Sequence, residues 1–186
     1  MSKVFINYRT GDESFAAVHL DDRLCERLGA ENVFRDSRAI PPGKDFDRRI
    51  WDELSGCSLM IVVMGPRWLS ERLHSEADYV RREIAFALAH GIDVMPVLVG
   101  DVALPMDEDL PEDIRPLRRR QYRRIHARSA QADVDGVLTA VEGVLGAPAP
   151  APSAPPAAGR SAHFHDLHGD LVMGDKVSGD KIVWRP

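Results

Sequence analysis

The sequence has few cysteines, no long apolar run and no excess of positive charge. Among its 186 residues only Cys25 and Cys57 are cysteines, which favours reduced thiols over a disulfide framework or a metal site. No apolar run approaches the roughly 18 residues needed to span a bilayer, and the opening run MSKVFINY is too short for a signal peptide. The formal net charge of -5 argues against general nucleic-acid binding. We therefore expect a soluble, cytoplasmic protein that binds neither nucleic acid nor membrane.

Several motifs of nucleotide and metal chemistry are also missing. No G-x-G-x-x-G follows the first predicted strand and no Walker sequence occurs, so dinucleotide binding of the Rossmann or P-loop type is not expected. HFHDLH, at 163–168, contains three histidines. The lack of cysteine partners favours a solvated polar stretch there, and zinc binding is the alternative. We predict neither a metal nor a bound cofactor.

What is present is a regular alternation of apolar runs and helical patterns. Such alternation predicts an α/β fold with a parallel sheet that helices cover on both faces. Five units fit a flavodoxin-like sheet of strand order 2-1-3-4-5. Pro96 is awkward inside a central strand and suggests a bulge or an edge-like position. The predicted strands are 3–8, 32–36, 58–65, 93–100 and 121–125, and the predicted helices are 12–29, 44–57, 78–91 and 133–146.

In this strand order the topological switch point lies between strands one and three, where ligands bind outside the carboxyl ends of the strands. Those ends are Asn7-Tyr8-Arg9 and Met64-Gly65-Pro66. Arg9 either faces phosphate groups there or is a solvated loop arginine. Gly65 either allows a close backbone approach or serves a plain turn.

The chain divides into three parts by composition. Residues 1–146 form the predicted domain, and the Pro/Ala-rich stretch 147–160 is a linker. Residues 161–186 contain three copies of G-D-x-(apolar)-x at a period of five. Self-association as β-structure or recruitment of a partner is favoured over plain disorder for this tail. A basic run, RPLRRRQYRR at 115–124, is interpreted as a solvated face, with an interaction surface as the alternative.

One glutamate stands out in the predicted helix 78–91. Glu83 lies one step off the apolar stripe and has no basic residue four positions away, whereas Tyr79 lies on its own side. A lone helical glutamate is most often solvated. This one, however, follows strand three and so lies near the switch point, where a ring and a carboxylate together suit a planar cationic group.

Four stretches carry a resemblance to a known family: VFINYRTGDESFA, VFRDSRAIPPGKDF, SLMIVVMGPRWLSE and DYVRREIAFALAHGIDVMPVLV. They resemble the Toll/interleukin-1 receptor (TIR) domain of bacterial type, across about residues 1–146. The second stretch resembles the BB loop of that family. The fourth resembles most closely the TIR domains that hydrolyse NAD+.

The resemblance implies roles for individual residues. Glu83 would be the catalytic carboxylate, and Tyr79 would take the position where the family usually has Trp. Asp36 also suits a turn cap, and Trp68 also suits core packing. The implied substrate-binding residues are Tyr8, Arg9, Phe34, Asp36, Gly43, Trp68 and Tyr79.

The implied activity is cleavage of the nicotinamide–ribose bond of NAD+, to nicotinamide and ADP-ribose or a cyclic product. One carboxylate suffices because nicotinamide leaves as a neutral molecule and needs no general acid, unlike the leaving oxygen of most glycosides. NAD+ is then a substrate and not a cofactor. The resemblance further implies homo-oligomers or filaments through TIR–TIR contacts and a role in bacterial defence signalling. The alternative is a non-catalytic TIR adaptor or scaffold.

Overall fold

A five-stranded parallel sheet forms the centre of the domain. The computed structural model describes residues 3–35 and 46–146, with the backbone alone for 46–49. The strands run in the order β2-β1-β3-β4-β5, and every neighbouring pair is parallel, which confirms the predicted α/β fold and strand order. Their bounds are β1 (Lys3–Tyr8), β2 (Val33–Arg35), β3 (Cys57–Met64), β4 (Asp93–Val99) and β5 (Arg123–Ile125).

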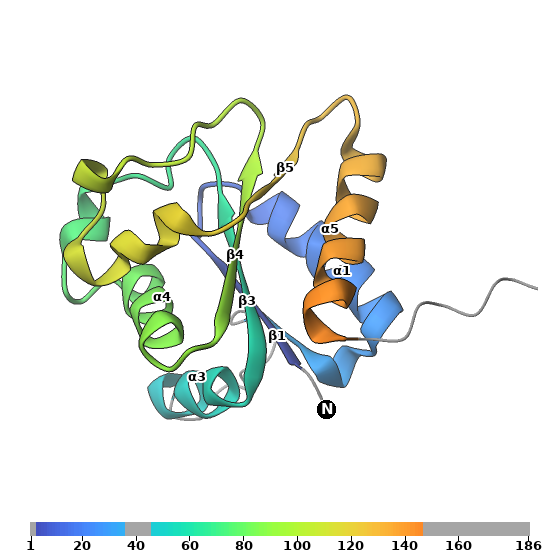
Figure 1. Ribbon diagram of the computed structural model, residues 1–186, viewed down its shortest axis with the longest axis horizontal. Coiled ribbons are helices and arrows are strands. Elements are labelled where there is room, and N and C mark those ends of the chain that lie inside the picture. The colour runs from blue at the N-terminus through green and yellow to red at the C-terminus, as the bar shows by residue number, and fades with distance from the viewer. Residues whose placement is uncertain (1–2, 36–45, 147–186) are drawn as a thin grey trace, which may run out of the picture. The chain divides into compact units, whose positions relative to one another are not determined.

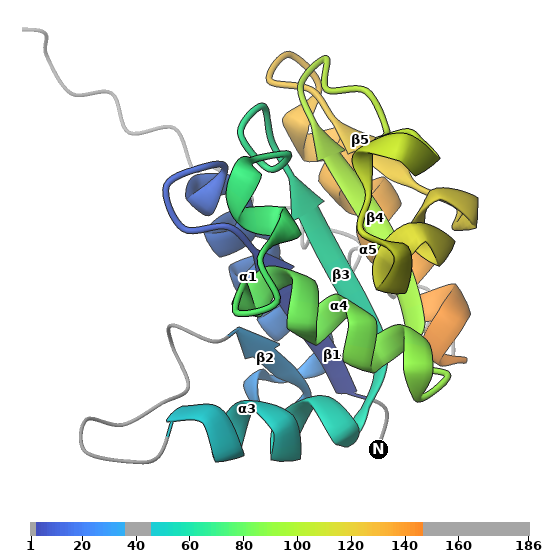
Figure 2. The same ribbon diagram turned by 90° about the vertical axis from the view of Figure 1, so that its left-hand side faces the viewer.

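Helices cover both faces of this sheet (Figure 1). Helices α1 (Ser14–Leu28) and α5 (Ala130–Leu145) lie on one face, and α3 (Phe46–Ser55) and α4 (Tyr79–Ala89) lie on the other. Figure 2 shows the second face, where α4 crosses in front of the central strands. Four short 3-10 helices complete the described part: η1 (Ala30–Asn32), η2 (Glu71–His74), η3 (Asp107–Asp109) and η4 (Glu112–Arg119).

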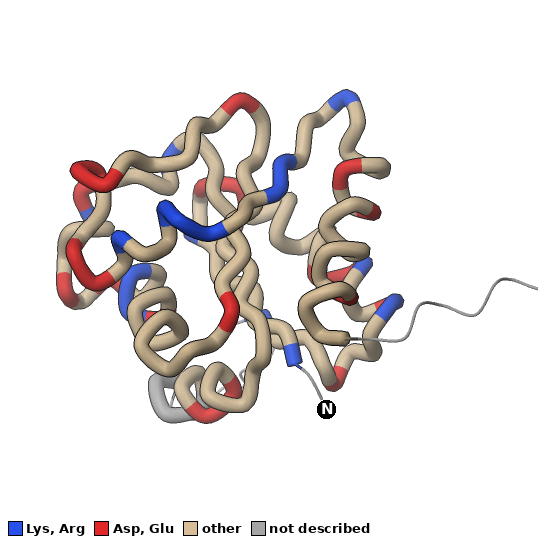
Figure 3. Tube along the Cα trace, viewed as in Figure 1, with Lys and Arg blue, Asp and Glu red and all other residues tan. Residues whose placement is uncertain are grey.

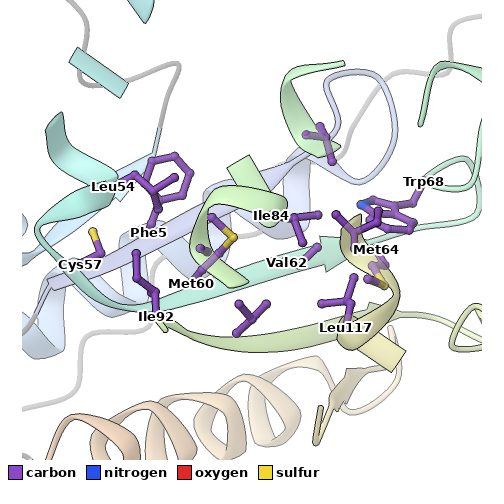
Figure 4. Packing of buried hydrophobic residues seen from close by; sticks show 14 of the residues in the cluster. Phe5, Leu54, Cys57, Met60, Val62, Met64, Trp68, Ile84, Ile92 and Leu117 are labelled. Carbon is purple, nitrogen blue, oxygen red and sulfur yellow. The ribbon is translucent and has the colours of Figure 1, made fainter. Parts of the chain in front are cut away.

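Alternate side chains of each strand enter separate cores on the two faces. Met60, Val62 and Met64 of β3 pack beneath α3 and α4, as Figure 4 shows. Leu59, Ile61 and Val63 of the same strand belong to the cluster under α1 and α5. Because successive residues of a strand point to opposite faces, a strand buried on both sides becomes apolar along nearly its whole length. This is why β1, β3 and β4 can be recognised from sequence as continuous apolar runs.

The predicted elements are all present, with bounds at most three residues from those expected. Pro96 pairs with Val62 in an uninterrupted register between β3 and β4, so no bulge forms there. Strand β5 pairs only with residues 97–99 of β4. Pro96 therefore precedes the part of β4 that has a neighbour on that side, which favours the edge-like position.

Among the helices that the structure describes, none is long and apolar enough to cross a membrane. Cys25 is half-buried and Cys57 buried, and both are free thiols. The structure describes no group of three metal-ligating side chains within 3–35 and 50–146. The histidines of 163–168, the linker and the tail lie outside the described residues. Figure 3 shows the basic run as separate blue segments along η4 and β5.

Candidate active site

The candidate site forms where β1 ends and α4 begins. Asn7 and Tyr8 are the last residues of β1, and Arg9 follows them. Asp78 is the N-cap residue of α4, which carries Tyr79 and Glu83 one turn apart. Strand β3, at the centre of the sheet, pairs with β1 up to Tyr8. These segments meet at the predicted switch point between β1 and β3.

Glu83 is buried, and a neighbouring strand supplies a hydrogen-bond donor to it. Its side chain belongs to a residue only 3% exposed. The Asn7 Nδ2 donates to Glu83 Oε2 at 2.7 Å and to the carbonyl oxygen of Val80 at 3.3 Å. A buried carboxylate needs such donors because burial removes its hydration. The Asn7 amide is one such donor, and it carries no charge of its own.

Arg9 and Asp78 form a buried ion pair beside this glutamate. Arg9 Nη1 and Nη2 lie 2.8 and 3.2 Å from the two oxygens of Asp78, and Arg9 Nε donates to the Trp68 carbonyl at 3.3 Å. Both members of the pair are buried. Asp78 Oδ1 also accepts the backbone N–H of Arg81 at 3.0 Å, as an N-cap does. One carboxylate thus starts α4 and anchors it to the end of β1.

A small cavity of about 180 Å³ opens next to this ion pair. Tyr79 is 40% exposed and forms part of its wall. The guanidinium of Arg82 lies 5.2 Å from the centre of the Tyr79 ring, which restrains the ring from its outer side. The residues lining the cavity are Tyr8, Arg9, Thr10, Arg72, Asp78, Tyr79 and Val80.

Arg35, the last residue of β2, lies over the ring of Tyr8. Arg35 Nε donates to Asp21 Oδ2 at 3.0 Å, and the Arg35 guanidinium lies 6.0 Å from the Tyr8 ring centre. Asp21 is fully buried on α1. Burial acts to lower the pKa of Arg35, but the hydrogen bond and charge of Asp21 outweigh it and raise the pKa overall. The guanidinium therefore stays charged and keeps α1 joined to the end of β2.

Gly65 allows the close backbone approach that was one of its two interpretations. The Asp12 carboxylate accepts the backbone N–H groups of Gly65 at 2.9 Å and Arg67 at 2.8 Å. A Cβ atom at position 65 would meet the Asp12 oxygens at 2.7 Å and would also clash with Glu13 Cγ. A side chain there would push the loop before α1 away from the end of β3.

The structure brings together part of the predicted set. Tyr8, Arg9 and Tyr79 share the cavity wall, and Glu83 lies one turn along α4 from Tyr79. Phe34 is buried and its ring stacks on Phe5 with centroids 5.2 Å apart. Asp36 and Gly43 lie outside the described residues.

Trp68 is placed in the core, the second of its two interpretations. It is 1% exposed and packs at the end of the α3–α4 cluster near Met64 and Leu117 (Figure 4). Its backbone carbonyl, and not its ring, reaches Arg9.

The site also contains residues that were not predicted as site residues, namely Asn7, Thr10, Arg72, Asp78 and Val80. An amide at the end of the apolar run VFIN is a signal that could have identified Asn7 as a buried polar group. Asp78 stands directly before a helical pattern, as N-cap residues do. Nothing in the sequence around Arg72 distinguishes it from other surface arginines.

Comparisons with known proteins agree with this architecture. A family model described as TIR domain matches residues 4–138. The chain is 31% identical over 114 residues to the NAD(+) hydrolase sarm1 of Drosophila melanogaster, an alignment that spans 60% of this chain and 8% of that protein.

Two solved structures share the fold. The TIR domains of the activated Roq1 resistosome superpose with a TM-score of 0.56 at 14% identity, covering 76% of this chain and 99% of that chain. The TIR domain of the Toll-related receptor TRR-2 from Hydra magnipapillata gives a TM-score of 0.51 at 21% identity, covering 77% and 98%.

Proposed function

The chain belongs to the TIR domain family, and from this premise we propose that it cleaves the nicotinamide–ribose bond of NAD+ with Glu83 as the catalytic carboxylate. The observation that supports the proposal most is the placement of Glu83. Glu83 is buried and its carboxylate accepts a hydrogen bond from Asn7, near the carboxyl end of β1. It lies one turn of α4 from Tyr79, whose ring forms part of the cavity wall. The similarity to a protein named as an NAD(+) hydrolase adds support.

The chemistry requires one fixed negative charge. The bond from ribose C1′ to the ring nitrogen breaks, its electron pair stays with nicotinamide, and positive charge develops on the ribose. A preorganised carboxylate stabilises that charge without having to reorient during the reaction. Water then adds to C1′ and releases a proton, giving ADP-ribose, or an adenine nitrogen of the same molecule adds and gives a cyclic product.

The residues around Glu83 have separate proposed tasks. The exposed ring of Tyr79 stacks on the nicotinamide, which carries the positive charge before cleavage. Tyr8 forms the facing part of the wall. Arg9 holds Asp78 and thereby the start of α4. Asp36 and Gly43 remain proposed substrate-binding residues on the sequence resemblance alone.

The decisive experiment measures nicotinamide release from NAD+ by the purified full chain, both in dilute solution and under crowding. Glu83→Gln keeps the shape of the side chain and removes its charge, so we expect activity to fall by at least about a thousandfold, since this charge provides the main electrostatic stabilisation. Glu76→Gln, an exposed glutamate shortly before α4, is the matched control and should retain full activity. Activity that survives in Glu83→Gln would contradict the proposed mechanism. Absence of activity in every assembled form would favour an adaptor.

We also propose that the chain acts as a homo-oligomer or filament through TIR–TIR contacts, in a defence role, and that the tail 161–186 recruits further copies or another protein. The likeness to TIR domains described within a resistosome supports the first part. Deleting 147–186 and measuring particle size together with NAD+ cleavage tests the second. Unchanged assembly and activity after the deletion would contradict a role for the tail.

A further inference from the structure

Within the part of the chain that the structure describes, one of the two arginines that line the cavity beside Tyr79 forms no ion pair. Arg9 and Arg72 both line the cavity. Arg9 is buried and bound by both oxygens of Asp78, so these two charges cancel within the wall. Arg72 is exposed, and no ion pair of its guanidinium exists among the side chains of 3–35 and 50–146. The cavity wall therefore has a net positive charge on its outer side.

The backbone that carries Arg72 is held firmly. Leu73 is fully buried in the core, and its N–H donates to the Ser70 carbonyl at 2.9 Å. The Ser75 N–H donates to the carbonyl of Arg72 at 3.0 Å. Arg81 Nη1 donates to the carbonyl of His74, the last residue of η2, at 2.9 Å. The backbone on either side of Arg72 is thus hydrogen-bonded within the domain, whereas Arg72 itself is exposed.

The position of Arg72 relative to Glu83 suits a phosphate group. Tyr79 precedes Glu83 by four residues, which is about 6 Å along a helix axis, and Arg72 shares the cavity with Tyr79. In a β-nucleotide the base at C1′ and the phosphate-bearing C5′ project from the same side of the ribose. A ribose at Glu83 with its nicotinamide against Tyr79 therefore directs its phosphate side toward the same cavity.

We propose that Arg72 binds the diphosphate of the dinucleotide and thereby selects phosphorylated nicotinamide nucleotides over the bare riboside. This inference rests on the proposed NAD+ cleavage. It assigns to Arg72 the phosphate contact that the strand-end position had suggested for Arg9. Arg9 already uses three of its N–H donors within the protein, whereas the fork of Arg72 can meet two phosphate oxygens at once.

The test compares substrates that share the scissile bond but differ in phosphate. Arg72→Gln should raise the KM for NAD+ about ten- to a hundredfold, because a hydrogen bond to a charged group of this strength is lost, and should change kcat little. Cleavage of nicotinamide riboside, which has no phosphate, should be unchanged. Arg72→Lys should give an intermediate KM, since lysine keeps the charge but not the fork. Raising the salt concentration should raise the KM of the unmodified protein for NAD+ and have less effect on Arg72→Gln.

Arg67→Gln is the matched control, because Arg67 is an exposed arginine of the preceding turn that does not line the cavity. Its KM for NAD+ should equal that of the unmodified protein. An equal loss of activity toward NAD+ and the riboside in Arg72→Gln would overturn the inference, and so would an unchanged KM for NAD+.

Binding of ADP-ribose, measured by calorimetry, separates the inference from the proposed function. If the protein fails to cleave NAD+ but binds ADP-ribose, and Arg72→Gln weakens that binding about tenfold or more, the proposed reaction is wrong and the phosphate contact is correct. If cleavage depends on Glu83 while Arg72→Gln binds ADP-ribose normally, the reaction stands and the inference is wrong. A protein that neither cleaves NAD+ nor binds ADP-ribose would overturn both.

Discussion

The side-chain amide of Asn7 donates a hydrogen bond to the candidate catalytic carboxylate of Glu83. Asn7 is 1% exposed and donates to both Glu83 and the Val80 carbonyl from the neighbouring strand. The hydrogen bond from the amide fixes the orientation of the carboxylate relative to β1. Among the described residues, Asn7 is therefore a positioning residue for Glu83 in the proposed reaction.

Replacing Asn7 tests this role. Asn7→Leu has a similar volume but no donor, so we expect kcat for NAD+ to fall about ten- to a hundredfold, the effect of one hydrogen bond to a charged group. Asn7→Ser retains a hydroxyl donor and should lose less activity. Equal losses of activity in Asn7→Leu and Asn7→Ser would indicate a packing role alone and would contradict the prediction.

Sequence reasoning found the glutamate but not its partner, for a physical reason. Glu83 stands out in the sequence because it lies one step off the apolar stripe with no basic residue four positions away, and the family resemblance implies its catalytic role. The contact with Asn7 joins residues 76 positions apart, and only the folded sheet brings the two together. Arg72 is harder still to predict, because its significance depends on Arg9 being neutralised by Asp78, a fact of three-dimensional structure.

At the scale of elements, the start of α4 determines the geometry of the site. Asp78 caps the helix through Arg81 and pairs with Arg9 at the end of β1. Helix α4 therefore cannot slide along the sheet without breaking both contacts. Tyr79 and Glu83, on the first two turns of this helix, are held at a fixed distance from Asn7 and Tyr8.

Asp78→Ser separates the two contributions, because serine can still cap the helix but cannot neutralise Arg9. Leaving a buried guanidinium without its partner should lower the free energy of unfolding by about 3–5 kcal/mol, measured by urea denaturation. Adding Arg9→Met to Asp78→Ser should recover most of that loss, since a buried ion pair can be replaced by apolar packing. A loss below about 1 kcal/mol in Asp78→Ser would mean that Arg9 is solvated in solution.

The elements themselves were predictable to different degrees. The buried strands and the amphipathic helices follow from the spacing of apolar residues, and their bounds agree closely with expectation. The 3-10 helix η4 was not predicted because Pro116 and its many charged residues are atypical of a regular helix. Its buried side chains, Ile114 and Leu117, follow the three-residue period of a 3-10 turn.

At the scale of the whole molecule, we expect the free energy of unfolding to fall at alkaline pH because of a buried thiol. Cys57 begins β3, and its Sγ donates to the Glu53 carbonyl at 3.2 Å. Burial raises the pKa of Cys57 from 9.0 to about 12. Between the two pKa values the Cys57 thiol therefore stays protonated in the folded protein but loses its proton in the unfolded chain. The corresponding stability is complete below pH 9 and is lost as the pH rises toward the folded pKa of about 12.

Comparison with Cys57→Ser isolates this effect from the other groups that titrate at high pH. Serine keeps a donor for the Glu53 carbonyl and does not ionise in this range. From pH 9 upward the unmodified protein should lose stability relative to Cys57→Ser by up to about 1.4 kcal/mol per pH unit, measured by urea unfolding at pH 8, 9 and 10. Parallel curves for the two proteins would show that the thiol ionises equally in both states.

The topology of the molecule was the most predictable level of all. Alternating strand and helix patterns leave few ways to cover a parallel sheet on both faces, and the observed order β2-β1-β3-β4-β5 is the one expected. Such reasoning locates the site at an end of the sheet. Topology alone does not predict the side-chain contacts that determine the net charge of the candidate site.

The double engagement of Asp78 also restricts how this gene can evolve. Any neutral replacement of Asp78 removes the counter-ion of Arg9, and most replacements also remove the helix cap. A neutral replacement of Arg9 instead leaves the Asp78 carboxylate without its guanidinium. A single substitution at either position therefore lowers the free energy of unfolding, and both positions must change together to restore it. During evolution we expect substitutions at the exposed residues of the cavity, Arg72 included. We expect Arg9 and Asp78 to stay the same.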